Sequence, residues 1–284
     1  MNSNITTLII GKRSNLSNRL FDCLGNSILI SSKDIADNID ILFEYTNNKL
    51  NIIFNNFQAS TLLNNNIGYD EYIVKAILNT SKILTYIQNK KIKINKIIYT
   101  SSSSVYGNNG YCTESDSVNP ISLQASLKIA NEELIKRFCY INKIRYTIVR
   151  LFNMYGGNDK FSIVSKIQNA YFHHEKLNVI NNGNAVRDYI HIDDVVRIYI
   201  KLLNKSDNIP SVLNVAKGEG QRLLDILNDL SNKGIKVQTN NIIKNEILTS
   251  IANVSKLNTL INTNDFVDVK NFLNNEIKKY ETYN

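Results

Sequence analysis

The chain has 284 residues, of which 43% are hydrophobic and 20% are charged. This length and composition exclude a peptide hormone and a disulfide-stabilised miniprotein, and they are typical of a protein that folds as one large domain or two coupled ones. The formal net charge is +8, from 33 Lys and Arg against 25 Asp and Glu. The basic residues are scattered and form no patch interleaved with aromatic residues, so we expect no nucleic-acid partner.

Three cysteines, Cys23, Cys112 and Cys139, lie far apart in the sequence and without paired spacing. This arrangement argues against a disulfide framework and against a zinc site, so we expect a reducing compartment and no bound metal. The first residues lack the basic segment of a signal peptide, and no apolar run reaches the roughly 18 residues of a membrane helix. We therefore expect a cytoplasmic protein with no membrane partner.

Apolar runs typical of strands alternate with amphipathic patterns typical of helices through the first half of the chain. In chain order, the predicted elements are strand 8–10, helix 16–24, strand 28–30, strand 50–54, helix 72–87, strand 97–99, helix 129–140 and strand 146–149. The strands are apolar throughout rather than at alternate positions, which is typical of parallel strands buried on both faces. The pattern predicts an α/β fold with a doubly wound parallel sheet.

The pattern loosens after residue 152. The elements predicted there are helix 162–173, strand 177–180, helix 193–203, strand 212–216 and helix 223–230. This mixture of helices and short strands indicates a smaller C-terminal α+β part.

The segment 11–17, which reads Gly-Lys-Arg-Ser-Asn-Leu-Ser, joins the first predicted strand to the first predicted helix. At this place a dinucleotide-binding protein has a glycine-rich turn, whose backbone amides and helix N-terminus hold the pyrophosphate. Ser14 and Ser17 occupy two of the three glycine positions. On its own, the segment is better explained as an ordinary helix start with Ser as the N-cap.

Five further segments carry a stronger signal because they occur in a fixed order. They are 100–107 (Thr-Ser-Ser-Ser-Ser-Val-Tyr-Gly), 119–132, 150–156, 183–194 and 213–219. Together they resemble the NAD-dependent epimerase/dehydratase group of the extended short-chain dehydrogenase/reductase family, whose members act on nucleotide sugars. The resemblance implies a Rossmann-type dinucleotide-binding domain (1–160 plus 187–215), a substrate-binding part (161–186 plus 216–284), and a site between them at the carboxyl ends of the strands.

The resemblance assigns the catalytic positions to Ser102, Gln124 and Lys128. Ser102 and Lys128 match the family's Ser and Lys, but Gln124 stands where the family has a Tyr that carries the proton. An amide donates a hydrogen bond to a carbonyl oxygen but does not shuttle a proton, and acid–base assistance is worth about 10²–10⁴-fold. Tyr106 and Tyr111 are therefore the candidate substitute acids.

We expect the remaining polar residues near the motifs to have structural roles, and one polar residue of the family to be absent from this chain. Tyr86 has the family's spacing to a later lysine, but in a chain with 15 Tyr this is a coincidence. Ala76 stands where the family commonly has an Asn that supports proton transfer. Asp188, Asp193 and Asp194 are expected to cap the following helix and to fix the loop before it.

The positions that bind ligands in the family match this chain more closely than the catalytic positions do. Asn153 and Arg187 match substrate-binding residues, and the Arg187 guanidinium suits a diphosphate. The predicted cofactor-binding residues are Gly11, Arg13, Ser14, Asn15, Leu16, Ser31, Lys33 and Lys128. The second predicted strand ends in uncharged serines, and Lys12 and Arg13 can hold a 2′-phosphate, so we expect NADP; Asp34 leaves NAD as the alternative.

The implied substrate is a nucleoside-diphosphate sugar. The leading hypothesis is an NADP-dependent oxidoreductase that reduces a 4-keto-6-deoxy sugar, because reduction depends least on a protein acid. An epimerase or dehydratase of the same group is the alternative enzyme. The alternative that is not an enzyme is a protein that binds a nucleotide sugar without converting it. Gln124 favours this alternative. Homodimers are common in such families, so a homodimer is the oligomer to test.

Overall fold

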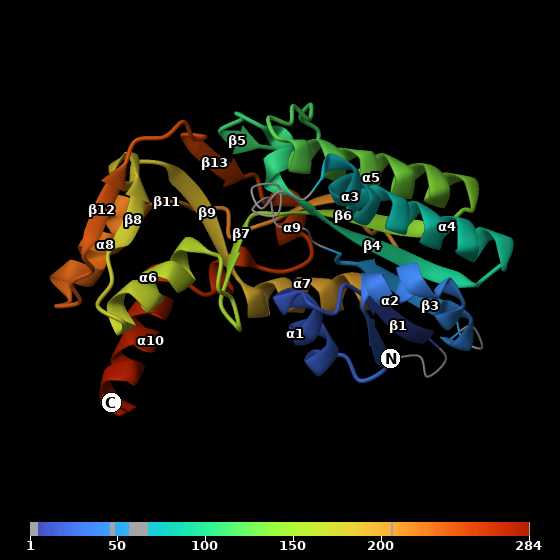
Figure 1. Cartoon of the computed structure of the whole chain (residues 1–284), viewed down its shortest axis with the longest axis horizontal. Helices are drawn as coiled ribbons and strands as arrows, with labels where there is room; N and C mark the ends of the chain where they lie inside the picture. The colour runs from blue at the N-terminus through green and yellow to red at the C-terminus, as the bar shows by residue number, and fades with distance from the viewer. Residues whose placement is uncertain (1–4, 46–48, 57–67, 206, 284) are drawn as a thin grey trace. The chain divides into compact units, whose positions relative to one another are not determined.

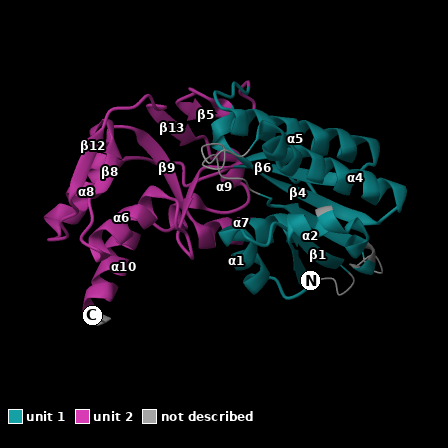
Figure 2. Ribbon diagram, in the orientation of Figure 1, with its two compact units in different colours: residues 1–105, 118–150, 199–213 teal, residues 106–117, 151–198, 214–284 magenta. Residues whose placement is uncertain are grey.

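The structure of the chain is a computed structural model that describes residues 5–45, 49–56, 68–205 and 207–283. Figure 1 shows its helices and strands, and Figure 2 colours its two compact units. Unit 1 consists of Met1–Val105, Val118–Arg150 and Tyr199–Leu213, and unit 2 consists of Tyr106–Ser117, Leu151–Ile198 and Asn214–Asn284. Each unit is therefore assembled from segments that are distant in the sequence.

Unit 1 is built on a six-stranded sheet with the order β10-β6-β4-β3-β1-β2. The strands are β1 (Ile5–Ile10), β2 (Ser27–Ile30), β3 (Lys49–Phe54), β4 (Ile94–Ser102), β6 (Arg145–Leu151) and β10 (Val212–Val215). β1 pairs in parallel with both β2 and β3, and β3 pairs in parallel with β4. The sheet therefore grows in both directions from β1, which confirms the Rossmann-type doubly wound α/β fold.

The middle strands of this sheet are buried because their apolar side chains face helices on both sides. Ile9, Ile53 and Ile98 are each 0% exposed. The helices of unit 1 are α1 (Asn15–Cys23), α2 (Ser32–Asp37), α3 (Tyr69–Ile73), α4 (Asn79–Asn89) and α5 (Leu123–Ile141), and α7 (Ile192–Asn204) runs through both units. In Figure 1, α4 and α5 lie together on one side of the sheet and α1 lies on the other.

Helix α5 begins at Leu123, not at residue 129 as the sequence pattern predicts. Ser122 is its N-cap, because its Oγ accepts a hydrogen bond from the backbone N–H of Ala125 at 3.2 Å. An N-cap of this kind starts a helix before its apolar periodicity becomes visible. The earlier start matters because it places Gln124 and Lys128 on the same helix.

Unit 2 is a mixed α+β structure. Its strands are β5 (Tyr111–Cys112), β7 (Asn153–Tyr155), β8 (Leu177–Ile180), β9 (Val186–His191), β11 (Gly220–Arg222), β12 (Thr239–Ile242) and β13 (Thr249–Ala252). Its helices are α6 (Ile163–Phe172), α8 (Leu223–Asn232), α9 (Ser255–Asn258) and α10 (Val269–Tyr283). β9 pairs with β7, β11 and β13, and a core between α6, α8 and α10 includes Ile167, Ile226 and Leu273.

Over the ranges that the structure describes, no helix combines the length and the apolar character needed to cross a membrane. None of the three cysteines, all of which lie in the described ranges, forms a disulfide bond; Cys23 is exposed, and Cys112 and Cys139 are buried.

Candidate functional site

Gly11 turns the chain from β1 into α1. Its φ of +124° lies in the region that favours glycine, and a Cβ atom here would lie 2.4 Å from the backbone oxygen of Asn55. Only glycine fits this position without moving the end of β3. A tight glycine turn that leads directly into a helix N-terminus fits the pyrophosphate of a dinucleotide, because the helix dipole and the free backbone amides favour an anion there.

A buried amide connects the two serines that replace glycines in this turn. Ser14 is the N-cap of α1 and accepts a hydrogen bond from the Ser17 N–H at 3.4 Å. The Nδ2 of Asn55 donates to Ser14 Oγ at 2.9 Å and to Ser17 Oγ at 2.8 Å. Asn55 is 4% exposed and Ser17 is 0% exposed. These hydrogen bonds hold the start of α1 against the end of β3. Glycines at residues 14 and 17 would instead let the backbones of α1 and β3 approach each other directly.

The other predicted cofactor residues differ in exposure. Arg13 and Lys33 are exposed, Leu16 is buried in the core, and Asn15 is the first residue of α1. Ser31 caps α2 by accepting a hydrogen bond from the Lys33 N–H at 3.1 Å. Leu16 can therefore meet a cofactor only through its backbone, whereas Arg13 and Lys33 present charged side chains.

Ser102 is the last residue of β4, and the 3₁₀ turn Ser103–Tyr106 follows it. The Oγ of Ser102 accepts a hydrogen bond from the backbone N–H of Ser104 at 3.2 Å and another from the Ser104 hydroxyl at 3.0 Å. The orientation of the Ser102 hydroxyl is therefore set within its own turn.

Lys128 lies on α5 and packs against the end of β4. Its Nζ donates a hydrogen bond to the backbone oxygen of Thr100 at 2.8 Å and lies 5.1 Å from the centroid of the Tyr99 ring. Thr100 precedes Ser102 on the same strand, and Gln124 lies one helical turn before Lys128. The structure thus brings the three predicted catalytic residues to one region of unit 1.

Glu132, one turn further along α5, anchors this region. Its carboxylate forms an ion pair with Arg150 of β6, with Nη2 to Oε2 at 2.9 Å, and the side chains of Glu132 and Arg150 are only 1% and 5% exposed. Ser101 of β4 donates a hydrogen bond to the same carboxylate. Burial lowers the pKa of Lys128 to about 8, and the negative charge of Glu132 acts in the opposite direction.

The candidate acids Tyr106 and Tyr111, and Tyr86 with its coincidental spacing, lie in three different environments. The Tyr86 hydroxyl donates to Asp40 at 2.8 Å, and burial together with this hydrogen bond raises the pKa of Tyr86 to about 12. The Tyr106 hydroxyl donates to Asn214 at 2.7 Å inside unit 2, where Tyr106 is 2% exposed. Tyr111 lies on β5 and is largely exposed. The environments of Tyr86 and Tyr106 are those of structural tyrosines.

Ala76, where the family commonly has an Asn, lies in a π-helical turn, Val74–Leu78, between α3 and α4. The Nδ2 of Asn131 on α5 donates to the backbone oxygen of Ala76 at 2.8 Å. Asn131 is 3% exposed. An asparagine is therefore present next to this position, but it is supplied by the neighbouring helix.

The two predicted substrate residues both belong to unit 2. Asn153 starts β7, and its Nδ2 donates to the backbone oxygen of Asp188 at 2.9 Å. Arg187 lies on β9 and forms an ion pair with Glu246 at 3.2 Å, in which both side chains remain partly exposed. A second Arg187 nitrogen donates to the backbone oxygen of Val186 at 2.9 Å. The guanidinium is thus held in place by Glu246, a residue that sequence analysis did not assign.

The acidic residues after Arg187 stabilise loops, as their positions predict. The buried carboxylate of Asp188 accepts hydrogen bonds from the N–H groups of Lys217 at 3.0 Å, Gly218 at 3.0 Å and Ala252 at 3.1 Å. Burial raises the pKa of Asp188 to about 7, and the three amides act in the opposite direction. Asp194 lies in the first turn of α7 and accepts a hydrogen bond from the N–H of Val267 at 2.9 Å.

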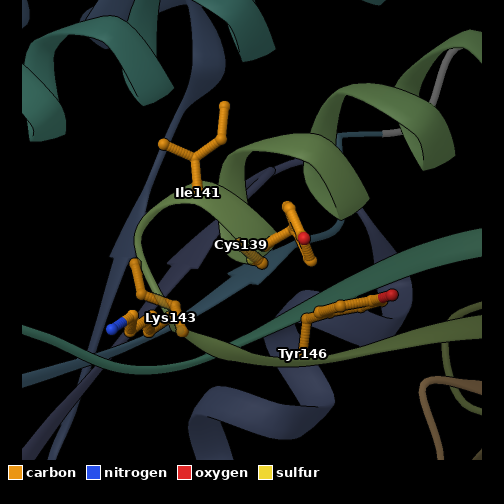
Figure 3. Close-up of a pocket in the computed structure, with 6 residues that line it drawn as sticks. Cys139, Ile141, Lys143 and Tyr146 are labelled. Carbon is orange, nitrogen blue, oxygen red and sulfur yellow. The ribbon is translucent and has the colours of Figure 1, made fainter.

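A surface hollow at the end of α5 is separate from these residues. Figure 3 shows its lining, which comprises Cys139, Tyr140, Ile141, Lys143, Ile144 and Tyr146. It contains no residue that the sequence assigns to a cofactor or a substrate. Within the described ranges, no cluster of His, Cys, Asp and Glu side chains is arranged to hold a metal ion.

Comparison with known proteins identifies the family. The model of the NAD dependent epimerase/dehydratase family matches residues 9–216, and the chain belongs to this family. Protein CapI of Staphylococcus aureus is 28% identical over 167 residues, which cover 51% of this chain and 50% of CapI. The matched region covers 60% of each of two further curated relatives, so the chain aligns with only part of their length.

Solved structures share the fold over nearly the whole chain. One is a UDP-glucuronic acid 4-epimerase from Bacillus cereus, solved in complex with a UDP-sugar and NAD, with a TM-score of 0.82 and 20% sequence identity. The alignment covers 98% of this chain and 100% of the epimerase chain. MoeE5 in complex with UDP-glucuronic acid and NAD has a TM-score of 0.83 at 18% identity and the same coverage. At these identities the likeness shows the fold.

We predict that Asn55→Ala lowers the free energy of unfolding by about 1 to 3 kcal/mol, because it removes the hydrogen bonds of a buried amide to Ser14 and Ser17. Urea denaturation measures the change. Asn18→Ala is the matched control, since the exposed Asn18 amide also bonds to this turn, at 2.9 Å from the Lys12 oxygen, and surface changes are usually within about 0.5 kcal/mol. Equal effects of the two substitutions would contradict the assigned role of Asn55.

We predict that wild-type protein gains stability relative to Lys128→Met as the pH rises from 8 to 10. Below pH 8, Lys128 is charged in both states and the folded state bears the cost of burying that charge. The pKa of Lys128 is about 8 in the folded state and about 10.4 in the unfolded state, so the folded state loses the proton first. The free-energy cost of burying the charge therefore falls by up to about 1.4 kcal/mol per pH unit. Urea titrations at several pH values, with Lys201→Met as the exposed control, test this; a difference that does not change with pH contradicts it.

Proposed function

We propose that this protein is an NADP-dependent oxidoreductase that reduces a 4-keto-6-deoxy sugar carried on a nucleoside diphosphate. The observation that carries the proposal is the set of groups near the end of β4: a hydroxyl at Ser102, a buried ammonium at Lys128, and an amide at Gln124 in place of the family's phenol. Hydrogen-bond donors and a cation stabilise negative charge that develops on a carbonyl oxygen. The missing phenol weighs against reactions that begin by taking a proton from a sugar hydroxyl.

Each residue then has a defined task. Ser102 donates a hydrogen bond to the carbonyl oxygen, the charge of Lys128 stabilises that oxygen as it becomes an alkoxide, and the Gln124 amide orients the sugar. Asn153 binds the sugar, and Arg187 binds the diphosphate through its planar guanidinium. The dinucleotide, when bound, supplies the hydride. The proton comes from water.

The preference for NADP is supported by charge at the dinucleotide turn. Arg13 and Lys33 are exposed there, and Ser31 at the end of β2 carries no charge that would repel a 2′-phosphate. Asp34, in the first turn of α2, is the residue that would favour NAD. The structural relatives described above were solved with NAD, so the choice between the two cofactors is a specific test of this chain.

We predict that the protein binds NADPH more tightly than NADH and that Arg13→Ala weakens NADPH binding by about 10- to 150-fold. This range corresponds to the loss of charged hydrogen bonds worth about 1.5–3 kcal/mol. Calorimetric titration of both cofactors measures it, and Arg19→Ala, on the helix α1 that follows this turn, is the control. Tighter binding of NADH, or no loss in Arg13→Ala, overturns the assignment.

We also propose that the protein acts in the cytoplasm as a homodimer. Three cysteines that form no disulfide bond, one of them exposed, are compatible with a reducing compartment. Tyr69, Ile73 and Leu78 leave apolar surface exposed along α3 and the π turn, at 73%, 39% and 44%. Such a surface suits a protein partner.

A different function remains as a second candidate, and Gln124 is the observation that favours it. A protein that keeps the ligand-binding residues but has lost the titratable group would bind a nucleotide sugar without converting it.

The variant Gln124→Tyr distinguishes these functions. We predict that it increases the rate of hydride transfer to a 4-keto-6-deoxy nucleotide sugar at least tenfold, because it restores a titratable group and acid–base assistance is worth about 10²–10⁴-fold. Gln124→Phe is the matched control, with the ring but without the hydroxyl, and NADPH absorbance reports the rate. Binding of the sugar without turnover in wild type and Gln124→Tyr would support the non-catalytic candidate.

A further inference from the structure

The hydroxyl of Ser102 receives two hydrogen bonds from one residue. The backbone N–H of Ser104 lies 3.2 Å from Ser102 Oγ, and the Ser104 hydroxyl lies 3.0 Å from it. Both residues are half-buried, and both belong to unit 1. The 3₁₀ turn Ser103–Tyr106 keeps Ser104 close to the end of β4.

This arrangement limits what the Ser102 hydroxyl can do. A serine hydroxyl has two acceptor lone pairs and one proton to donate. The two hydrogen bonds from Ser104 use both lone pairs. Among the residues that the structure describes, no acceptor is recorded for the remaining Ser102 proton. Ser102 is therefore presented as a hydrogen-bond donor and not as an acceptor.

We propose that Ser104 is a positioning residue that makes Ser102 a donor-only group, so that this subsite selects a sugar carbonyl over the corresponding hydroxyl. The inference rests on the proposed function, because it takes Ser102 as the residue that meets the reacting oxygen. A carbonyl oxygen only accepts hydrogen bonds and matches a donor-only partner. A sugar hydroxyl also has a proton to donate, and Ser102 offers no lone pair for it, which costs the hydroxyl ligand a hydrogen bond.

The same argument bears on the direction of the reaction. Oxidation of a sugar hydroxyl requires a group that takes up the hydroxyl proton. Ser102 with both lone pairs occupied cannot do so, and the amide of Gln124 is not a base. Ser104 therefore adds to the effect of Gln124: both residues favour a substrate that arrives as a ketone.

The test compares Ser104→Ala with Ser103→Ala, its neighbour in the same turn. Calorimetry measures the affinity of each variant for dTDP-4-keto-6-deoxyglucose and UDP-4-keto-6-deoxyglucose, and for the corresponding 4-hydroxy sugars, in the absence of a dinucleotide so that no turnover occurs. We expect Ser104→Ala to lower the preference for the keto form by about three- to tenfold, the size of one hydrogen bond between neutral groups. Ser103→Ala should keep the wild-type preference, and Ser104→Thr, which retains a hydroxyl, should restore it.

The outcomes separate this inference from the proposed function. If wild-type protein prefers the keto sugar and Ser104→Ala keeps the same preference, or loses affinity for both forms equally, Ser104 has no positioning role and the inference is overturned. If wild-type protein binds neither form, the proposed function fails, and the inference fails with it. A loss of preference in Ser104→Ala that Ser104→Thr reverses supports the inference.

Discussion

The arrangement of the candidate site depends on the buried carboxylate of Glu132. It joins three elements of unit 1, because it lies on α5, pairs with Arg150 of β6 and accepts a hydrogen bond from Ser101 of β4. A buried charge that loses its partner costs about 3–5 kcal/mol, so the three elements are held in one relative position. This position puts Lys128 against the backbone of Thr100 and leaves Ser102, two residues further along, at the carboxyl end of β4.

Around this anchor, the residue proposed to move a proton is the one that differs from the family motif. Lys128 is buried and residue 102 carries a hydroxyl, as the motif requires, but residue 124 is an amide. The two serines that replace glycines in the turn before α1 are compensated by new contacts, because the Asn55 amide donates a hydrogen bond to both Ser14 and Ser17. That turn is re-formed with hydrogen bonds, whereas the proton-carrying group at residue 124 is absent. The residues proposed to bind and orient ligands are therefore kept more fully than the residue proposed to move a proton.

The sequence predicts much of the fold because its strands and several helices have strong local patterns. Strand 177–180 is found as predicted, and the parallel sheet follows from continuous apolar runs such as 50–54. The sequence pattern does not predict helix α10, because only one residue per turn, at Val269, Leu273 and Ile277, is buried in an otherwise polar Asn- and Lys-rich segment. The start of α5 was missed because a capping serine, not an apolar residue, begins it.

For the site, motif order identifies the residues at the ends of strands but not their partners. Glu132 lies four residues after Lys128, so helical spacing could have indicated it. Asn55 and Glu246 have no local signal, since their partners, Ser14 and Arg187, are distant in the chain. Such contacts exist only in the folded structure. They determine how the predicted residues are oriented, which sequence alone does not give.

We propose that the chain delivers hydride to a sugar ketone despite the amide at residue 124. The most direct measurement uses NADPH deuterated at the transferable position and a 4-keto-6-deoxy nucleotide sugar, with mass spectrometry and NMR of the product. The account predicts a 4-hydroxy sugar that carries deuterium on C4. Recovery of the unlabelled ketone after prolonged incubation, with binding of both ligands demonstrated, would contradict it.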